Sequence, residues 1–155
     1  MAERSAGILL HRGGRGAAPE ILLVHFGGPY WWGEEAGAWS IPKGLIGDGE
    51  SAEEAARREF REELGSAAEG PLRPLATIRQ KGGKIVEAFA LEGDLDAEAI
   101  ESNLFTIEWP PRSGRMASFP EVDRARWFAL DEARAMILPS QLPLIDSLAA
   151  VLAEK

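Results

Sequence analysis

GLIGDGESAEEAARREFREELGS, from Gly44 to Ser66, is the stretch that decides how the whole sequence is interpreted. Ser51 and Glu54 have the spacing of a capping box, which predicts that a helix begins directly after Ser51. Gly65 is the residue type that ends helices in the left-handed conformation. Apolar side chains between these signals recur every four positions: Ala52, Ala56, Phe60 and Leu64. The sequence therefore predicts an amphipathic helix over residues 51–64, which follows a glycine-rich loop.

Three glutamates lie on one flank of this predicted helix. Glu59 is separated from Glu62 by three positions and from Glu63 by four. Like charges at these spacings repel by about 0.2–0.5 kcal/mol per pair on an exposed helix, and by more when they are partly desolvated. A divalent cation would relieve the repulsion, and Mg²⁺ prefers carboxylates, water and substrate phosphates as ligands. Arg58 precedes Glu62 by four positions and is expected to orient it. The alternative is an acidic helix face in solvent.

The same segment resembles the Nudix box, G-x5-E-x7-R-E-U-x-E-E-x-G-U, where U is a bulky apolar residue. The positions that fit are Gly44, Glu50, Arg58, Glu59, Phe60, Glu62, Glu63 and Gly65. Ser66 departs from the pattern, which has an apolar residue there, and we expect that position to pack against the core. The preceding residues 39–43, WSIPK, are similar to the segment that leads into the box in many Nudix hydrolases.

The resemblance implies an α/β fold of the Nudix type, an α/β/α sandwich with a central mixed sheet, formed by residues 1–155 as a single domain. It also implies a metal-dependent pyrophosphohydrolase that uses Mg²⁺ or Mn²⁺, in which water attacks a phosphorus of a nucleoside diphosphate linked to another group. The metal ligands that it implies are Glu59, Glu62, Glu63 and the carbonyl of Gly44, supported by Glu50. Arg58 and the same three glutamates would form the catalytic group.

Many members of this family have a further acidic residue outside the box, in the loop before the last strand. Glu121, in the segment FPEVD, is the candidate general base in this chain. Glu108 is a weaker candidate. The alternative for Glu121 is an ordinary carboxylate in a loop.

Substrate contacts are expected from local groups of positive charge and from one aromatic residue. The chain carries 17 Lys and Arg against 25 Asp and Glu, so positive charge gathered locally marks places where an anionic substrate would bind. These residues are Lys43, Lys81, Lys84, Arg112 and Arg115. Trp32, in a glycine-rich loop, is expected to stack on a nucleobase. The alternatives are solvated cations at a sheet edge and packing of Trp32 within its own loop.

Outside the box, apolar runs predict strands and two further helices. The predicted strands cover residues 5–11, 20–26, 39–41, 72–80, 85–91, 103–109 and 122–130. Helices are predicted over residues 131–136 and 140–153, and a loop over 110–120. The first two strands are expected to be neighbours, and the run ILLV at 21–24 predicts burial on both faces of the sheet.

Length and composition exclude several classes of protein. The 155 residues suit one compact domain, and the net charge of -8 disfavours binding to nucleic acid or to an anionic membrane. The absence of cysteine excludes disulfides, thiolate zinc sites and cysteine nucleophiles. The first twelve residues hold too short an apolar run for a signal peptide or a membrane span, so we expect a cytoplasmic protein. The oligomeric state, monomer or homodimer, stays open.

The expected partner is a small-molecule nucleotide substrate. A nucleoside triphosphate or dinucleoside polyphosphate is favoured, because WSIPKG is most similar to family members that act on these. The alternatives are a nucleotide-sugar hydrolase of the ADP-ribose type, a non-catalytic nucleotide-binding sensor, and an isomerase on the same scaffold. The intact Glu59, Glu62 and Glu63 disfavour the sensor, and the lack of cysteine disfavours the isomerase.

Overall fold

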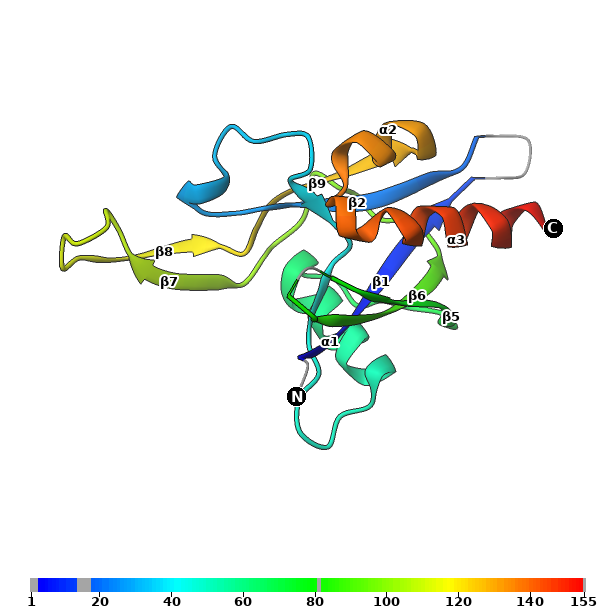
Figure 1. Ribbon diagram of the computed structural model, residues 1–155, viewed down its shortest axis with the longest axis horizontal. Coiled ribbons are helices and arrows are strands. Elements are labelled where there is room, and N and C mark those ends of the chain that lie inside the picture. The colour runs from blue at the N-terminus through cyan, green and yellow to red at the C-terminus, as the bar shows by residue number, and fades with distance from the viewer. Residues whose placement is uncertain (1–2, 14–17, 81, 155) are drawn as a thin grey trace.

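A mixed sheet forms the centre of the computed structural model, which describes residues 3–13, 18–80 and 82–154 (Figure 1). Strands follow one another across this sheet in the order β3 (Trp39–Ser40), β2 (Glu20–Phe26), β1 (Arg4–Arg12), β6 (Ile85–Glu92) and β5 (Arg73–Arg79). In addition, β4 (Lys43–Leu45) pairs with β1, and β9 (Val122–Ala129) pairs with β2. The β1–β6 pair is parallel and the other pairs are antiparallel, which confirms the predicted mixed sheet.

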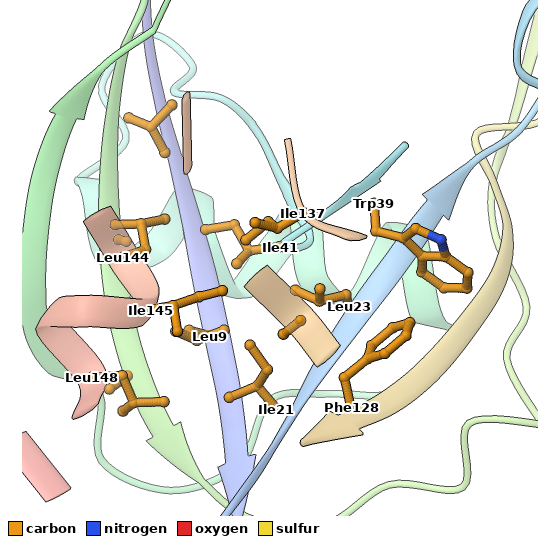
Figure 2. Close-up of a cluster of buried hydrophobic side chains, with 14 of the residues drawn as sticks. Leu9, Ile21, Leu23, Trp39, Ile41, Phe128, Ile137, Leu144, Ile145 and Leu148 are labelled. Carbon is orange, nitrogen blue, oxygen red and sulfur yellow. The ribbon is translucent and has the colours of Figure 1, made fainter. Parts of the chain in front are cut away.

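Helices cover both faces of this sheet. One face carries α1 (Ala52–Leu64), and the other carries α2 (Leu130–Met136) and α3 (Leu142–Ala153). Because side chains alternate along β1, Ile8 joins the core beneath α1 and Leu9 joins the core beneath α3. Figure 2 shows the core beneath α3. The arrangement confirms the predicted α/β/α sandwich. No helix in the described ranges is long and apolar enough to cross a membrane.

The ends of α1 are as predicted. Ser51 Oγ accepts the backbone N–H of Glu54 (3.1 Å), and the Glu54 carboxylate accepts the backbone N–H of Ser51 (2.9 Å). Gly65 ends the helix with φ +80°, a conformation that costs glycine little. Ser66 is exposed, so the expectation that this position packs against the core is wrong. Ala68 is the residue of this connection that is buried, and a serine at 66 therefore causes no loss of packing.

Gln141, which is distant in sequence, forms hydrogen bonds with the segment that leads into α1. Gln141, in the short 3₁₀ turn η2 (Pro139–Gln141), is fully buried. Its side-chain oxygen accepts the backbone N–H of Ile41 (3.1 Å), and its Nε2 donates to Ser40 Oγ (2.9 Å). These two bonds fix the position of β3, and with it the start of the glycine-rich loop.

Residues 104–120 contain a hairpin, which corrects the prediction of a loop over 110–120. β7 (Leu104–Glu108) pairs with β8 (Met116–Pro120) in an antiparallel two-stranded sheet. The hairpin projects from the body of the molecule (Figure 1). The sequence does not predict β8 because five residues that include serine and end in proline give little apolar periodicity. β4 is missed for a similar reason, since it has three residues and one is glycine.

The remaining strand and helix predictions are confirmed, with shifted ends. β1 and β2 pair as neighbours, and residues 21–24 are buried throughout. The helix predicted from residue 140 begins at Leu142, because residues 139–141 form the turn η2.

Candidate active site

The inner flank of α1 carries two buried carboxylates. Glu59 and Glu63 are both buried, and the side chain of Glu59 is 12% exposed against 39% for that of Glu62. Glu59 lies directly against the backbone of Gly44, because a Cβ built on that glycine would fall 2.0 Å from the Glu59 carboxyl carbon. The backbone N–H of Lys43 donates to the Glu63 carboxylate. The short strand β4 therefore brings the start of the glycine-rich loop onto the carboxylates of the helix.

Burial makes these carboxylates hard to ionise. It raises the pKa of Glu63 to about 9, with Glu59 and Glu121 adding to the effect and Lys43 opposing it. Burial also raises the pKa of Glu59, where the hydrogen bond from Arg58 opposes the shift and Glu62 and Glu121 add to it. A positive charge placed among these groups would therefore stabilise their ionised forms.

Arg58 organises the outer edge of the group. Its Nε donates to Glu50 (2.7 Å), and its Nη1 donates to Glu59 (2.9 Å) and Glu62 (3.1 Å). Its Nη2 donates to Glu50 (3.0 Å) and to the carbonyl of Leu45 (2.9 Å). The predicted contact with Glu62 is confirmed, and Arg58 ties the glycine-rich loop to the helix in addition. These bonds also lower the pKa of Glu50 to about 2, together with the backbone N–H of Gly47.

Glu121 is brought to the same group from the junction of β8 and β9. Its backbone N–H donates to the carbonyl of Asn103 (2.9 Å), and the backbone N–H of Asn103 donates to the carbonyl of Glu62 (2.8 Å). Burial raises the pKa of Glu121, Glu62 adds to the shift, and the Asn103 side chain opposes it by a hydrogen bond. Asn103 is a positioning residue that the sequence does not reveal. Glu108, in contrast, accepts the backbone N–H groups of Arg112 (3.0 Å) and Gly114 (3.2 Å) and closes the hairpin turn.

The donor chemistry of this group fits a divalent cation. Its side chains offer carboxylate oxygens, which Mg²⁺ and Mn²⁺ prefer. Glu63, its most buried member, forms no ion pair with an arginine of the described ranges. Within the described residues, no three His, Asp or Glu side chains are placed closely enough to form a ready-made metal cage. Arg58 Nη1 donates to an oxygen of Glu59 and to one of Glu62, so these two oxygens already have a cationic partner.

The predicted basic residues fall in three places. Lys43 and Lys84 line a cavity of about 270 Å³ together with Gln80, Leu138 and Ser140. Lys81 lies outside the described residues. Arg112 and Arg115 lie in the turn of the β7–β8 hairpin, which projects from the body of the molecule (Figure 1). The structure therefore brings Lys43 beside the carboxylates and leaves the two arginines away from them.

Trp32 belongs to an exposed aromatic cluster. Its side chain is 59% exposed and makes edge contacts with Trp109 (6.3 Å between ring centroids) and Phe119 (5.9 Å). Tyr30, in the short turn η1 (Pro29–Trp31), makes an edge contact with Trp109 (5.4 Å). Trp109 and Phe119 lie on the hairpin, and sequence reasoning missed them because the partners are distant along the chain. Phe119 stands two residues before Glu121, so the cluster begins close to the carboxylate group.

Comparisons with known proteins agree with this geometry. The family model described as NUDIX domain matches residues 1–148. An Ap4A hydrolase of C. elegans in a binary complex is 22% identical with a TM-score of 0.68, and the match covers 97% of this chain and 99% of that chain. The NUDIX domain of Shewanella oneidensis NrtR, complexed with ADP ribose, is 18% identical with a TM-score of 0.67, covering 98% and 89%. A structure from work on MutT of Aliivibrio salmonicida and Vibrio cholerae is 15% identical with a TM-score of 0.60, covering 96% of each chain. At these identities the likeness is one of fold.

Proposed function

This chain belongs to the NUDIX domain family and is a Nudix pyrophosphohydrolase, and from that premise we propose that it cleaves a nucleoside triphosphate or a dinucleoside polyphosphate with Mg²⁺ or Mn²⁺. The observation that carries the proposal is the group formed by Glu59, Glu62, Glu63 and Glu121, in which three carboxylates have raised pKa values. A protein gains nothing in stability from burying such a group without a cation.

Each member of the group has a proposed role. The carboxylates of Glu59, Glu62 and Glu63 and the carbonyl of Gly44 would hold the metal. A bound divalent cation neutralises phosphate charge and lowers the pKa of bound water. Glu121 would act as the general base, because a partly buried carboxylate with a raised pKa accepts a proton readily near neutral pH. Arg58 would keep Glu59 and Glu62 in position through the hydrogen bonds that it donates.

Two features favour a substrate with several phosphates. Lys43 and Lys84 line one cavity, and the charge of Lys43 interacts with those of Glu63 and Glu59, so the two lysines would meet a chain of negative charges that starts at the carboxylates. The exposed ring of Trp32 would offer a face to a nucleobase. The similar structures include both an Ap4A hydrolase and an ADP-ribose complex, so a nucleotide-sugar hydrolase is the alternative.

A substrate panel tests this choice. We expect a higher kcat/KM for ATP or diadenosine tetraphosphate than for ADP-ribose, with Mg²⁺ or Mn²⁺ present. The preference should shrink as salt approaches 1 M, where the screening length is about 3 Å. Equal kcat/KM values at low salt would favour the nucleotide-sugar hydrolase. Tight nucleotide binding without turnover of any member of the panel would identify a sensor instead.

Neutralising the lysines gives an independent test of the same proposal. The double change of Lys81 and Lys84 to Ala should raise KM more for the tetraphosphate than for ADP-ribose, because the longer chain would make more charge-assisted contacts. Arg73→Ala is the matched control, since it removes a positive charge from β5 at a residue that pairs with Glu154 (3.4 Å). A similar rise in KM for both substrates would contradict a role in recognising chain length.

A further inference from the structure

β9 has one residue more than its neighbour β2 where the two strands approach the candidate active site (Figure 1). In their antiparallel pairing, His25 lies opposite Arg124. The next residue of β2 lies opposite Val122, so the ladder passes over Asp123. Such a bulge reverses the alternation of side chains along a strand. Val122 accordingly packs in the core beneath α1, whereas the guanidinium of Arg124 lies over the ring of Trp39 in the core beneath α3.

The bulge determines how the chain arrives at Glu121. This residue directly precedes Val122, and it therefore enters β9 from the side of the sheet that carries α1. The start of the loop 27–38 packs against the same point. The backbone N–H of Gly27 donates to the carbonyl of Glu121 (2.9 Å), and a Cβ on Gly27 would fall 1.9 Å from the carbonyl oxygen of Pro120. A change in the bulge would therefore move both Glu121 and the loop.

The imidazole of His25 joins the bulge to the other end of the loop 27–38. Its side chain is 1% exposed. Its Nδ1 lies 2.8 Å from Asp123 Oδ1, and its Nε2 lies 2.6 Å from the carbonyl oxygen of Glu34. Both oxygens accept hydrogen bonds, so each ring nitrogen that carries a hydrogen donates to the oxygen that faces it. One buried side chain therefore has one contact with the bulge and another with the loop.

We propose that His25 is a positioning residue with two separate roles. Through Asp123 it fixes the bulge that places Glu121, the general base of the proposed function, beside α1. Through Glu34 it fixes the loop that carries Trp32, the contact for a nucleobase in the proposed function. The inference rests on the proposed function for these two roles. It assigns them to different ring nitrogens, so that the bond at Nδ1 determines kcat and the bond at Nε2 determines KM.

Two substitutions of His25 separate the roles, because each keeps one of the two bonds. The amide nitrogen introduced by His25→Asn lies near the position of Nδ1, and that introduced by His25→Gln lies near the position of Nε2. His25→Gln should lower kcat about 100-fold and leave KM nearly unchanged, since a displacement of about 1 Å at a catalytic group has this effect. His25→Asn should raise KM about tenfold, the equivalent of one lost hydrogen bond, with little effect on kcat. A residue that only stabilised the fold would change kcat and KM alike in both variants.

Amide hydrogen exchange in EDTA gives a second measurement that needs no turnover. The backbone N–H of Glu121 is bonded to the carbonyl of Asn103, so His25→Gln should speed its exchange and His25→Asn should not. Thermal melting establishes that each variant is folded. Asp123→Ala removes the same bond as His25→Gln from a partly exposed position, and it provides the test if His25→Gln does not fold. Asp131→Ala is the matched control, because Asp131 is exposed in the first turn of α2.

Several outcomes would overturn the proposal. They are equal kcat values for His25→Gln and His25→Asn, the kcat of the wild type in a folded Asp123→Ala variant, an unchanged KM in His25→Asn, or equal exchange at Glu121 in all variants. Kinetics are measured with the nucleotide of the panel that the wild type hydrolyses. If the wild type hydrolyses none of them, the proposed function is refuted, and the exchange at Glu121 alone decides whether His25 positions this residue. Turnover without the difference between the two His25 variants refutes the positioning roles alone.

Discussion

Replacing Glu63 by Gln should stabilise the metal-free protein at alkaline pH. Burial raises the pKa of this carboxyl to about 9 in the folded chain, against about 4.5 in an unfolded one. The folded state therefore binds the proton more tightly, so the stability is fully present below pH 4.5 and is lost as pH rises towards 9. Glutamine has nearly the shape of protonated glutamic acid and does not titrate, so Glu63→Gln should be free of this loss.

The size of the effect follows from the two pKa values. At pH 8 the folded protein must keep a proton on Glu63 that the unfolded chain has released, which costs about 5 kcal/mol. Rearrangement of Glu59, Glu121 and Lys43 around the ionised group reduces this cost, so we take about 2 kcal/mol as a working value. In a chain of this length that amounts to about 4–8 °C in Tm.

Thermal melts in EDTA at pH 5, 6.5 and 8 would measure the difference in stability between Glu63→Gln and the wild type. The Tm of Glu63→Gln should exceed that of the wild type by about 4–8 °C at pH 8, and the difference should vanish near pH 5. Glu69→Gln is the matched control, because Glu69 is exposed and the same change there should leave the pH dependence as it is. Parallel Tm curves for the wild type and Glu63→Gln across this range would refute the explanation from burial.

Three further predictions concern the metal and the base. Mg²⁺ at a hundredfold excess over its Kd should stabilise the wild type by about 2.7 kcal/mol in scanning calorimetry, and the triple change of Glu59, Glu62 and Glu63 to Gln should abolish this gain while the variant stays folded. Titration calorimetry of Glu121→Gln should show most of the Mn²⁺ affinity retained, and kcat should fall about 10²–10⁴-fold. Full activity of this variant would indicate that the general base is a residue of α1 instead. Gly44→Ala should lose Mn²⁺ affinity, because its Cβ would displace Glu59; unchanged affinity would show that Glu59 does not need this contact.

The sequence predicts the parts of the site that depend on local structure. Helix capping at Ser51, the end at Gly65 and the facing of Glu59 and Glu63 all follow from spacing along one helix. The placement of Glu121 beside them depends on Asn103, which bridges two segments through backbone bonds, and no periodicity in the sequence reveals that bridge.

Other parts of the site depend on residues that are distant in sequence. Gln80 and Ser140 meet across a separation of 60 positions, so the cavity that they close has no signature in either segment. The position of Arg112 and Arg115 in a hairpin turn is likewise not evident from the sequence, because charge alone does not show that residues 104–120 project as a hairpin.

The buried amide of Gln141 also has a consequence for the order in which the chain can fold during synthesis. Its bond to Ser40 spans 101 positions, so at about 5–20 residues per second the segment leading into α1 waits roughly 5–20 s for this partner. The parallel pairing of β1 with β6 likewise joins distant segments, and such contacts form slowly. Until Gln141 leaves the ribosome, Ser40 and Ile41 lack the side chain that fixes β3, although α1 and its capping box can already form.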